Sequence, residues 1–101
     1  RTIAFTSNLP HVTAVALMDS ASYNDKTKYF VAGSFRDGTR VADINPELWC
    51  ALFLANKEKV ADEIDKYMEQ LKLWRKALRS GDGETLKNLM RTSAARRKEL
   101  Y

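Results

Sequence analysis

Two arginines and an aspartate stand close together in the segment Gly33-Ser34-Phe35-Arg36-Asp37-Gly38-Thr39-Arg40. If this segment turns as a helix, Arg36 and Arg40 lie one turn apart on the same face, and Asp37 lies within one turn of Arg40. Arginine presents a rigid, permanently charged fork that pairs with carboxylate or phosphate groups. The spacing is therefore typical of a clamp for an anion that carries more than one acidic group. The alternative is a solvated turn between helices that holds an internal salt bridge.

The one histidine, His11, follows the segment Ser7-Asn8-Leu9-Pro10. The first two residues of that segment can cap a helix, and the proline is tolerated in a first turn, where its missing N–H costs nothing. The pattern predicts a helix that continues to about Tyr23. His11 would then lie near the positive end of the helix dipole, where it can face a bound anion. The alternative is a structural or merely exposed histidine.

The sequence between 24 and 46 predicts two short helices and then a clear helix boundary. A short helix is expected over 26–32, with Gly33 as its C-cap, and another over about 35–42. The clearest boundary follows, because Asn45 can act as an N-cap and Pro46 suits the first helical position.

A long central helix is expected from Pro46 to about Arg79, roughly 50 Å at 1.5 Å per residue. Its first half, from Leu48 to Ala55, is apolar on several sides and must be buried on more than one of them. Trp49 in this half is either a core residue or part of a site, and Cys50 is expected on a buried face. The second half carries an apolar seam at heptad spacing that requires a packed partner helix. The seam consists of Val60, Ile64, Tyr67, Leu71, Trp74 and Leu78.

The last helix is expected from Glu84 to about Leu100, after a turn at Gly81 and Asp82, and we expect it to pack antiparallel to the seam. A chain of 101 residues has little else to cover this apolar surface, so the pattern predicts a homodimer. The sequence thus predicts an all-α fold in a single domain. Only Thr2 to Thr6 allows a short strand, and a linker is the alternative there.

The composition, 45% hydrophobic and 30% charged, is that of a soluble globular chain, with no run long enough to span a bilayer. Arg1 in place of Met, with no signal peptide, indicates a fragment, and one cysteine favours the cytoplasm. The chain has no glycine-rich phosphate loop, no metal-ligand spacing and no complete catalytic constellation. We therefore expect neither a metal site nor membrane binding.

Positive charge gathers near the end of the chain, where the stretch from Lys72 to Lys98 holds nine basic residues against Asp82 and Glu84. One hypothesis is a helical module that binds nucleic acid or acts as a scaffold. The alternative is a solvated helix face or a subunit contact, and recognised nucleic-acid motifs are absent.

Three segments taken together resemble the C-terminal helical domain of prephenate dehydrogenase. They are Ser7-Asn8-Leu9-Pro10-His11, the stretch from Gly33 to Ala42, and Pro46-Glu47-Leu48-Trp49 followed by Leu54-Ala55-Asn56-Lys57. The resemblance covers nearly the whole chain in order and spacing, and the combination is specific although each piece alone is weak.

The resemblance implies the dimerisation and substrate-binding domain of an enzyme that oxidatively decarboxylates prephenate to 4-hydroxyphenylpyruvate in tyrosine biosynthesis. It implies that NAD or NADP and the catalytic residues belong to an amino-terminal Rossmann domain outside this chain. This fragment would then bind no cofactor, contain no catalytic residue and be inactive by itself. Its partners would be a second copy and the small molecule prephenate, and not nucleic acid.

The same resemblance assigns roles to individual residues. Arg40 is similar to the arginine that binds a substrate carboxylate, and His11 to the histidine that contacts the substrate. Gly33 and Trp49 match positions near the pocket. Asp37 matches a residue that pairs ionically at its mouth, and Arg36 would add supporting charge. Two positions depart from the usual family motifs: Asn8 stands where the family usually has a histidine, and Ser34 stands where it usually has a second glycine. The choice between prephenate and arogenate therefore stays open.

Overall fold

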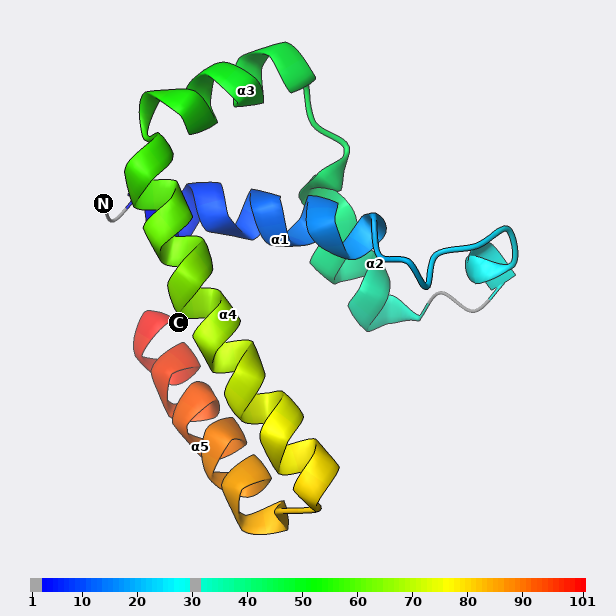
Figure 1. Ribbon diagram of the computed structural model, residues 1–101, viewed down its shortest axis with the longest axis vertical. Coiled ribbons are helices and arrows are strands. Elements are labelled where there is room, and N and C mark those ends of the chain that lie inside the picture. The colour runs from blue at the N-terminus through cyan, green and yellow to red at the C-terminus, as the bar shows by residue number, and fades with distance from the viewer. Residues whose placement is uncertain (1–2, 30–31) are drawn as a thin grey trace. The chain divides into compact units, whose positions relative to one another are not determined.

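The computed structural model describes residues 3–29 and 32–101, and every regular element within these ranges is a helix (Figure 1). The elements are Ala4–Asn8 (η1, a π-helix), Leu9–Met18 (α1), Thr27–Tyr29 (η2), Gly33–Thr39 (α2), Arg40–Ala42 (η3), Pro46–Ala55 (α3), Lys57–Ser80 (α4) and Gly83–Leu100 (α5). The all-α class predicted from the sequence is confirmed. The chain divides into two compact units, Arg1–Ile64 and Asp65–Tyr101, which are described separately.

The first helical stretch begins earlier than the sequence predicted. Asn8 has helical angles, φ −68° and ψ −49°, and its side chain makes no capping bond. The preceding π-helix is closed by a bond from the Leu9 N–H to the Ala4 carbonyl. In a regular α-helix the ring of Pro10 would clash with the carbonyl four residues earlier. The wider turn of a π-helix accommodates the ring. The expectation of a cap at Ser7 or Asn8, and of a strand or linker from residue 3 onward, is therefore wrong.

Hydrogen bonds between polar side chains and the backbone make α1 and the helix after it shorter than the sequence predicted. Helix α1 ends at Met18 and not near Tyr23, because the Ser20 side chain accepts a bond from the Ser22 N–H at 3.2 Å and competes with helical bonding. The Asn24 side chain likewise accepts from the Lys26 N–H at 2.8 Å. Only the short η2 follows, and the end of the helix predicted over 26–32 lies partly outside the described residues.

The boundary at Asn45 is confirmed, because its side chain accepts a bond from the Leu48 N–H at 3.1 Å and Pro46 is the first residue of α3. The helix expected to run unbroken from 46 to 79 is interrupted. Asn56 leaves the helical region with φ −130° and ψ 31°, so α3 ends at Ala55. The long central helix is thus α4, which begins at Lys57.

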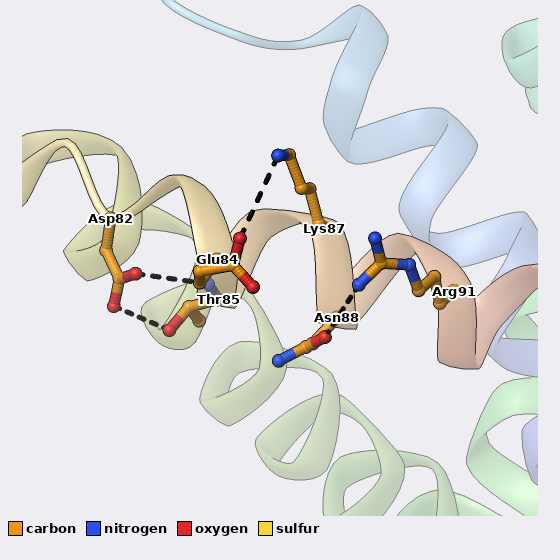
Figure 2. A network of polar contacts seen from close by, with 6 residues as sticks. All are labelled: Asp82, Glu84, Thr85, Lys87, Asn88 and Arg91. Atoms are coloured by element: carbon orange, nitrogen blue, oxygen red, sulfur yellow. Dashed lines mark hydrogen bonds and ion pairs between the residues drawn. The ribbon is translucent and has the colours of Figure 1, made fainter.

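The turn into α5 follows the prediction closely. Gly81 has φ 69°, and the Asp82 N–H reaches back to the Ala77 carbonyl at 2.9 Å, which is the Schellman pattern. Asp82 then caps α5 by accepting bonds from the Thr85 N–H at 3.1 Å and from its hydroxyl at 2.6 Å (Figure 2). Within the second unit, α5 turns back beside the second part of α4 (Figure 1).

The seam predicted to pack against α5 is covered only in part. Trp74 of the seam is half-buried beside Ala77, which is 3% exposed, whereas Leu71 and Leu78 of the seam are 49% and 63% exposed. Both leucines lie about 100–120° around the helix from Ala77 at 3.6 residues per turn. The side of α4 that holds Ala77 and Trp74 is therefore covered, while Leu71 and Leu78 remain accessible.

The described residues contain few buried apolar side chains, and none of the large ones is fully buried. Cys50, expected on a buried face, is exposed, and so are its neighbours Leu48, Leu52 and Leu54 on α3. Helix α3 has no buried residue at all. Within residues 3–29 and 32–101, no helix has the length and apolar character required to cross a bilayer.

The Asp82 cap supplies a pH-dependent contribution to stability. Hydrogen bonds from the Thr85 hydroxyl and, to a smaller extent, from the Thr85 N–H lower the pKa of the Asp82 carboxyl below its usual value. Because the pKa of Asp82 is lower in the folded chain than in the unfolded chain, the cap contributes its full stability at pH values above the unfolded pKa. This contribution is lost as pH falls through the folded pKa.

We expect Asp82→Ala to lower the thermal midpoint of unfolding at pH 7, and to lower it by less as pH approaches 3. The matched control is Asp25→Ala at an exposed turn, and an Asp82→Ala effect equal at both pH values would contradict the account.

Candidate functional site

His11 is held by a backbone carbonyl of the π-helix η1, which directly precedes α1. Its Nδ1 lies 2.8 Å from the Ser7 carbonyl oxygen, and the ring is half-buried. Because a carbonyl only accepts, Nδ1 must carry the proton in this contact. The Nε2 atom is then the free position, which accepts a hydrogen bond when the ring is neutral and donates one when it is charged.

The ring of His11 stacks on Trp49. Their centroids are 3.9 Å apart with 24° between the planes, and Phe53 continues the group at 5.5 Å from Trp49. The contact joins α1 to α3, which are far apart in the sequence. Trp49 itself is half-buried, so its position combines packing with partial access to solvent. Together with the Ser7 contact, the stack fixes both the plane and the tautomer of the imidazole.

The arginine segment lies against the helix that carries His11. Both α2 and η3 pack on α1 within the first unit. Arg40 opens η3 and has an exposed side chain. Helix α1 thus contacts α2 and η3 by backbone packing, and it contacts α3 through the stack of His11 on Trp49.

The remaining predicted site residues are exposed on α2. Among the described residues, neither Arg36, Asp37 nor Arg40 makes an ion pair, so the salt bridge of the alternative interpretation is not present. Gly33 begins α2 rather than ending the preceding helix. A Cβ added at Gly33 meets nothing within 4 Å, and its φ is not in the positive region, so packing within this chain does not require glycine there.

The two departures from the family motifs occupy different environments. Asn8 is 5% exposed in the π-helix, whereas Ser34 is exposed in the first turn of α2. The π-helix thus places Asn8 inside the first unit, while His11, three residues later, is half-buried.

A separate hollow of about 550 Å³ lies in the second unit along α4. It is open and lined by Lys72, Arg75, Lys76, Arg79 and Ser80, so none of the predicted site residues borders it. Within the described ranges, no group of three or more histidine, cysteine, aspartate or glutamate side chains is arranged to hold a metal ion.

Sequence reasoning missed the Ser7 carbonyl and Phe53. The Ser7 carbonyl lies in the π-helix η1. The pattern of residue types does not predict a π-helix, apart from the unusual position of Pro10. Phe53 follows Trp49 by four residues, so its position on the same helical face could have been inferred once α3 was placed.

The helical domain has known counterparts. The family described as prephenate dehydrogenase, dimerization domain, matches residues 1–92. The fold is shared with an arogenate dehydrogenase from Synechocystis at a TM-score of 0.89 and 22% identity, covering 99% of this chain and 38% of that one. A prephenate dehydrogenase from A. aeolicus, solved with hydroxyphenyl propionate and NAD+, gives a TM-score of 0.76 and 32% identity over 96% of this chain and 36% of that one.

Two relatives support the same family by sequence. A cyclohexadienyl dehydrogenase from Zymomonas mobilis is 40% identical over 83% of this chain and 30% of its own length. A prephenate dehydrogenase from Bacillus subtilis is 31% identical over 86% of this chain and 24% of its own length. These features define an all-helical domain of the dehydrogenase type. The chain belongs to the prephenate dehydrogenase dimerization-domain family, and it spans about a quarter to a third of these relatives.

The His11 geometry predicts an unusual tautomer. Because the Ser7 carbonyl holds the Nδ1 proton, neutral His11 should have a pyrrole-like Nδ1 and a pyridine-like Nε2 in a ¹H–¹⁵N multiple-bond spectrum. The chain has one histidine, so its signal needs no assignment by mutation. Trp49→Leu should shift the ring protons by removing the stacked indole. A neutral ring protonated at Nε2 would contradict the hydrogen bond.

Proposed function

We propose that this chain is the dimerisation and substrate-binding domain of a prephenate dehydrogenase, which oxidatively decarboxylates prephenate to 4-hydroxyphenylpyruvate. Two contacts of α1 carry the proposal, in a chain that belongs to this family: η3, which begins at Arg40, packs on α1, and His11 of α1 stacks on Trp49. The A. aeolicus relative was solved with hydroxyphenyl propionate, an aromatic carboxylate, which supports the same class of ligand here.

In this proposal each residue binds or orients, and none performs hydride transfer. Arg40 pairs with a substrate carboxylate through its exposed guanidinium, since charge-assisted bonds to carboxylates are strong and directional. His11 presents Nε2 to the substrate, and Trp49 keeps the imidazole plane fixed. Gly33 leaves open space at the start of α2, while Arg36 and Asp37 supply charge around the entrance.

The cofactor belongs to another part of the protein. NAD accepts the hydride when bound, and the A. aeolicus relative was solved with NAD+. This chain has no glycine-rich phosphate loop, so its own residues are unsuited to hold a dinucleotide. We infer that an amino-terminal domain outside this chain holds NAD or NADP and the catalytic residues, and that the isolated chain is inactive.

The partner in the proposed assembly is a second copy of the chain. The exposed apolar residues of α3, Leu48, Leu52 and Leu54, are 54%, 42% and 62% accessible. A helix that is apolar on several sides is stable in water only when other protein surface covers it. The dimerization-domain family supports a homodimer as that cover. The alternative of a nucleic-acid module gains no support from the family.

Arg40→Ala tests the substrate role in the complete enzyme. Loss of a charged hydrogen-bonding partner should raise the KM for prephenate about 10- to 100-fold, because such bonds contribute about 1.5–3 kcal/mol. The KM for NAD should stay nearly unchanged. The matched control is Arg36→Ala, one turn away and equally exposed, which should change the KM for prephenate by only a few-fold. An unchanged KM in Arg40→Ala would refute the assigned role.

A further inference from the structure

Two residues of α3 are half-buried, and both are aromatic. They are Trp49 and Phe53, whereas the other residues of this helix are exposed. The exposed residues include three leucines, Leu48, Leu52 and Leu54, which are 54%, 42% and 62% accessible. Leucine is as apolar as either ring, so hydrophobicity alone does not explain which side of α3 is covered. The covered side is the one on which the aromatic rings contact each other and His11.

Phe53 lies next to Trp49 because of the helix geometry. Side chains of an α-helix point back toward its N-terminus, so the ring at position 53 lies over the turn that holds position 49. The centroids of the two rings are 5.5 Å apart, with 49° between their planes. This distance lies in the range that aromatic pairs prefer, and such a pair stabilises its geometry beyond the contribution of buried area.

The indole of Trp49 contacts two rings at once. It stacks on the imidazole of His11 at 3.9 Å with 24° between the planes, and it also meets Phe53. A half-buried indole can rotate about two side-chain bonds, and each contact that it makes removes part of this freedom. The phenyl ring therefore restricts the indole to the orientation in which it stacks on the imidazole.

The stack controls the direction of the free nitrogen of His11. The Ser7 carbonyl lies 2.8 Å from Nδ1, but one hydrogen bond tolerates a range of ring tilts. The flat face of the indole removes this remaining freedom. Nε2 is the atom that the proposed function assigns to the substrate, and a hydrogen bond weakens steeply when its angle departs from the preferred range. The position of the phenyl ring thus affects the bond that Nε2 makes.

We propose that Phe53 is a positioning residue for His11. It holds Trp49 in the orientation that stacks on the imidazole, and the stack directs Nε2 toward the carboxylate-bearing substrate. This inference rests on the proposed function, because it requires His11 to contact the substrate. All three residues belong to the first unit of the chain, Arg1–Ile64.

Steady-state kinetics of the complete enzyme test the proposal. Phe53→Leu removes the ring and keeps an apolar side chain, so it should raise the KM for prephenate about two- to tenfold, which corresponds to the loss of one aromatic pair. The rise should not exceed that of His11→Gln, since a positioning residue acts only through the group that it positions. Phe53→Tyr keeps the ring and should leave the KM close to that of the parent enzyme. The KM for NAD should stay nearly unchanged in all three variants.

A double-mutant cycle separates positioning from a general structural effect. In the Trp49→Leu background, and equally in the His11→Gln background, Phe53→Leu should change the KM for prephenate little further, because the series of contacts is already broken. The matched control is Phe35→Leu, the same change at a half-buried phenylalanine of α2 that makes no ring contact with the stack among the described residues. Its effect, whatever its size, should be the same with and without the indole. Thermal midpoints show that each variant is folded in the assay, and Phe53→Met provides a second variant that lacks the ring.

The outcomes distinguish this inference from the proposed function. If His11→Gln leaves the KM for prephenate unchanged, the assignment of His11 to the substrate is wrong, and the positioning role fails with it. If His11→Gln raises the KM but Phe53→Leu does not, the positioning role alone is overturned. The same conclusion follows if Phe53→Leu raises the KM equally with and without Trp49. A rise that is absent in Phe53→Tyr and disappears in the Trp49→Leu background supports the role.

Discussion

The constraint on which the structure depends is that its helices carry more apolar surface than the described residues bury. Within residues 3–29 and 32–101, the buried apolar residues are Ala4, Leu9, Ala14, Val60 and Ala77, and three of these five are alanines. Burial of small side chains contributes little free energy, because the hydrophobic contribution scales with the area removed from water. Leu71 and Leu78 on α4, like Leu52 on α3, therefore need cover from outside the chain. In the proposed homodimer, the second copy would supply this cover.

The candidate site is built on the same helices as this incomplete core. His11 depends on Trp49 for its orientation, and Trp49 belongs to α3, whose leucines are exposed. Covering α3 would therefore also steady the indole against which the imidazole stacks. In this account dimerisation and substrate binding are physically coupled, since one surface that requires a partner also supports a residue proposed to contact the substrate.

Much of the fold was predictable because its signals are local. Asn45 followed by Pro46, and Gly81 followed by Asp82, satisfy or redirect backbone groups within a few residues, so the sequence is sufficient to locate them. The π-helix before Pro10 and the break at Asn56 depend on how neighbouring turns share hydrogen bonds, which no apolar period reveals. The motifs identified the segments of the site, but only the structure showed that His11 and Trp49 stack.

The most direct measurement is the thermal midpoint of this 101-residue chain as a function of its concentration. If folding requires a second copy to cover α3 and α4, dissociation accompanies unfolding and the midpoint must rise with concentration. We expect a rise of several degrees between about 1 and 100 µM by circular dichroism at 222 nm. A cooperative transition whose midpoint is independent of concentration would show that the chain folds alone, and would contradict the account.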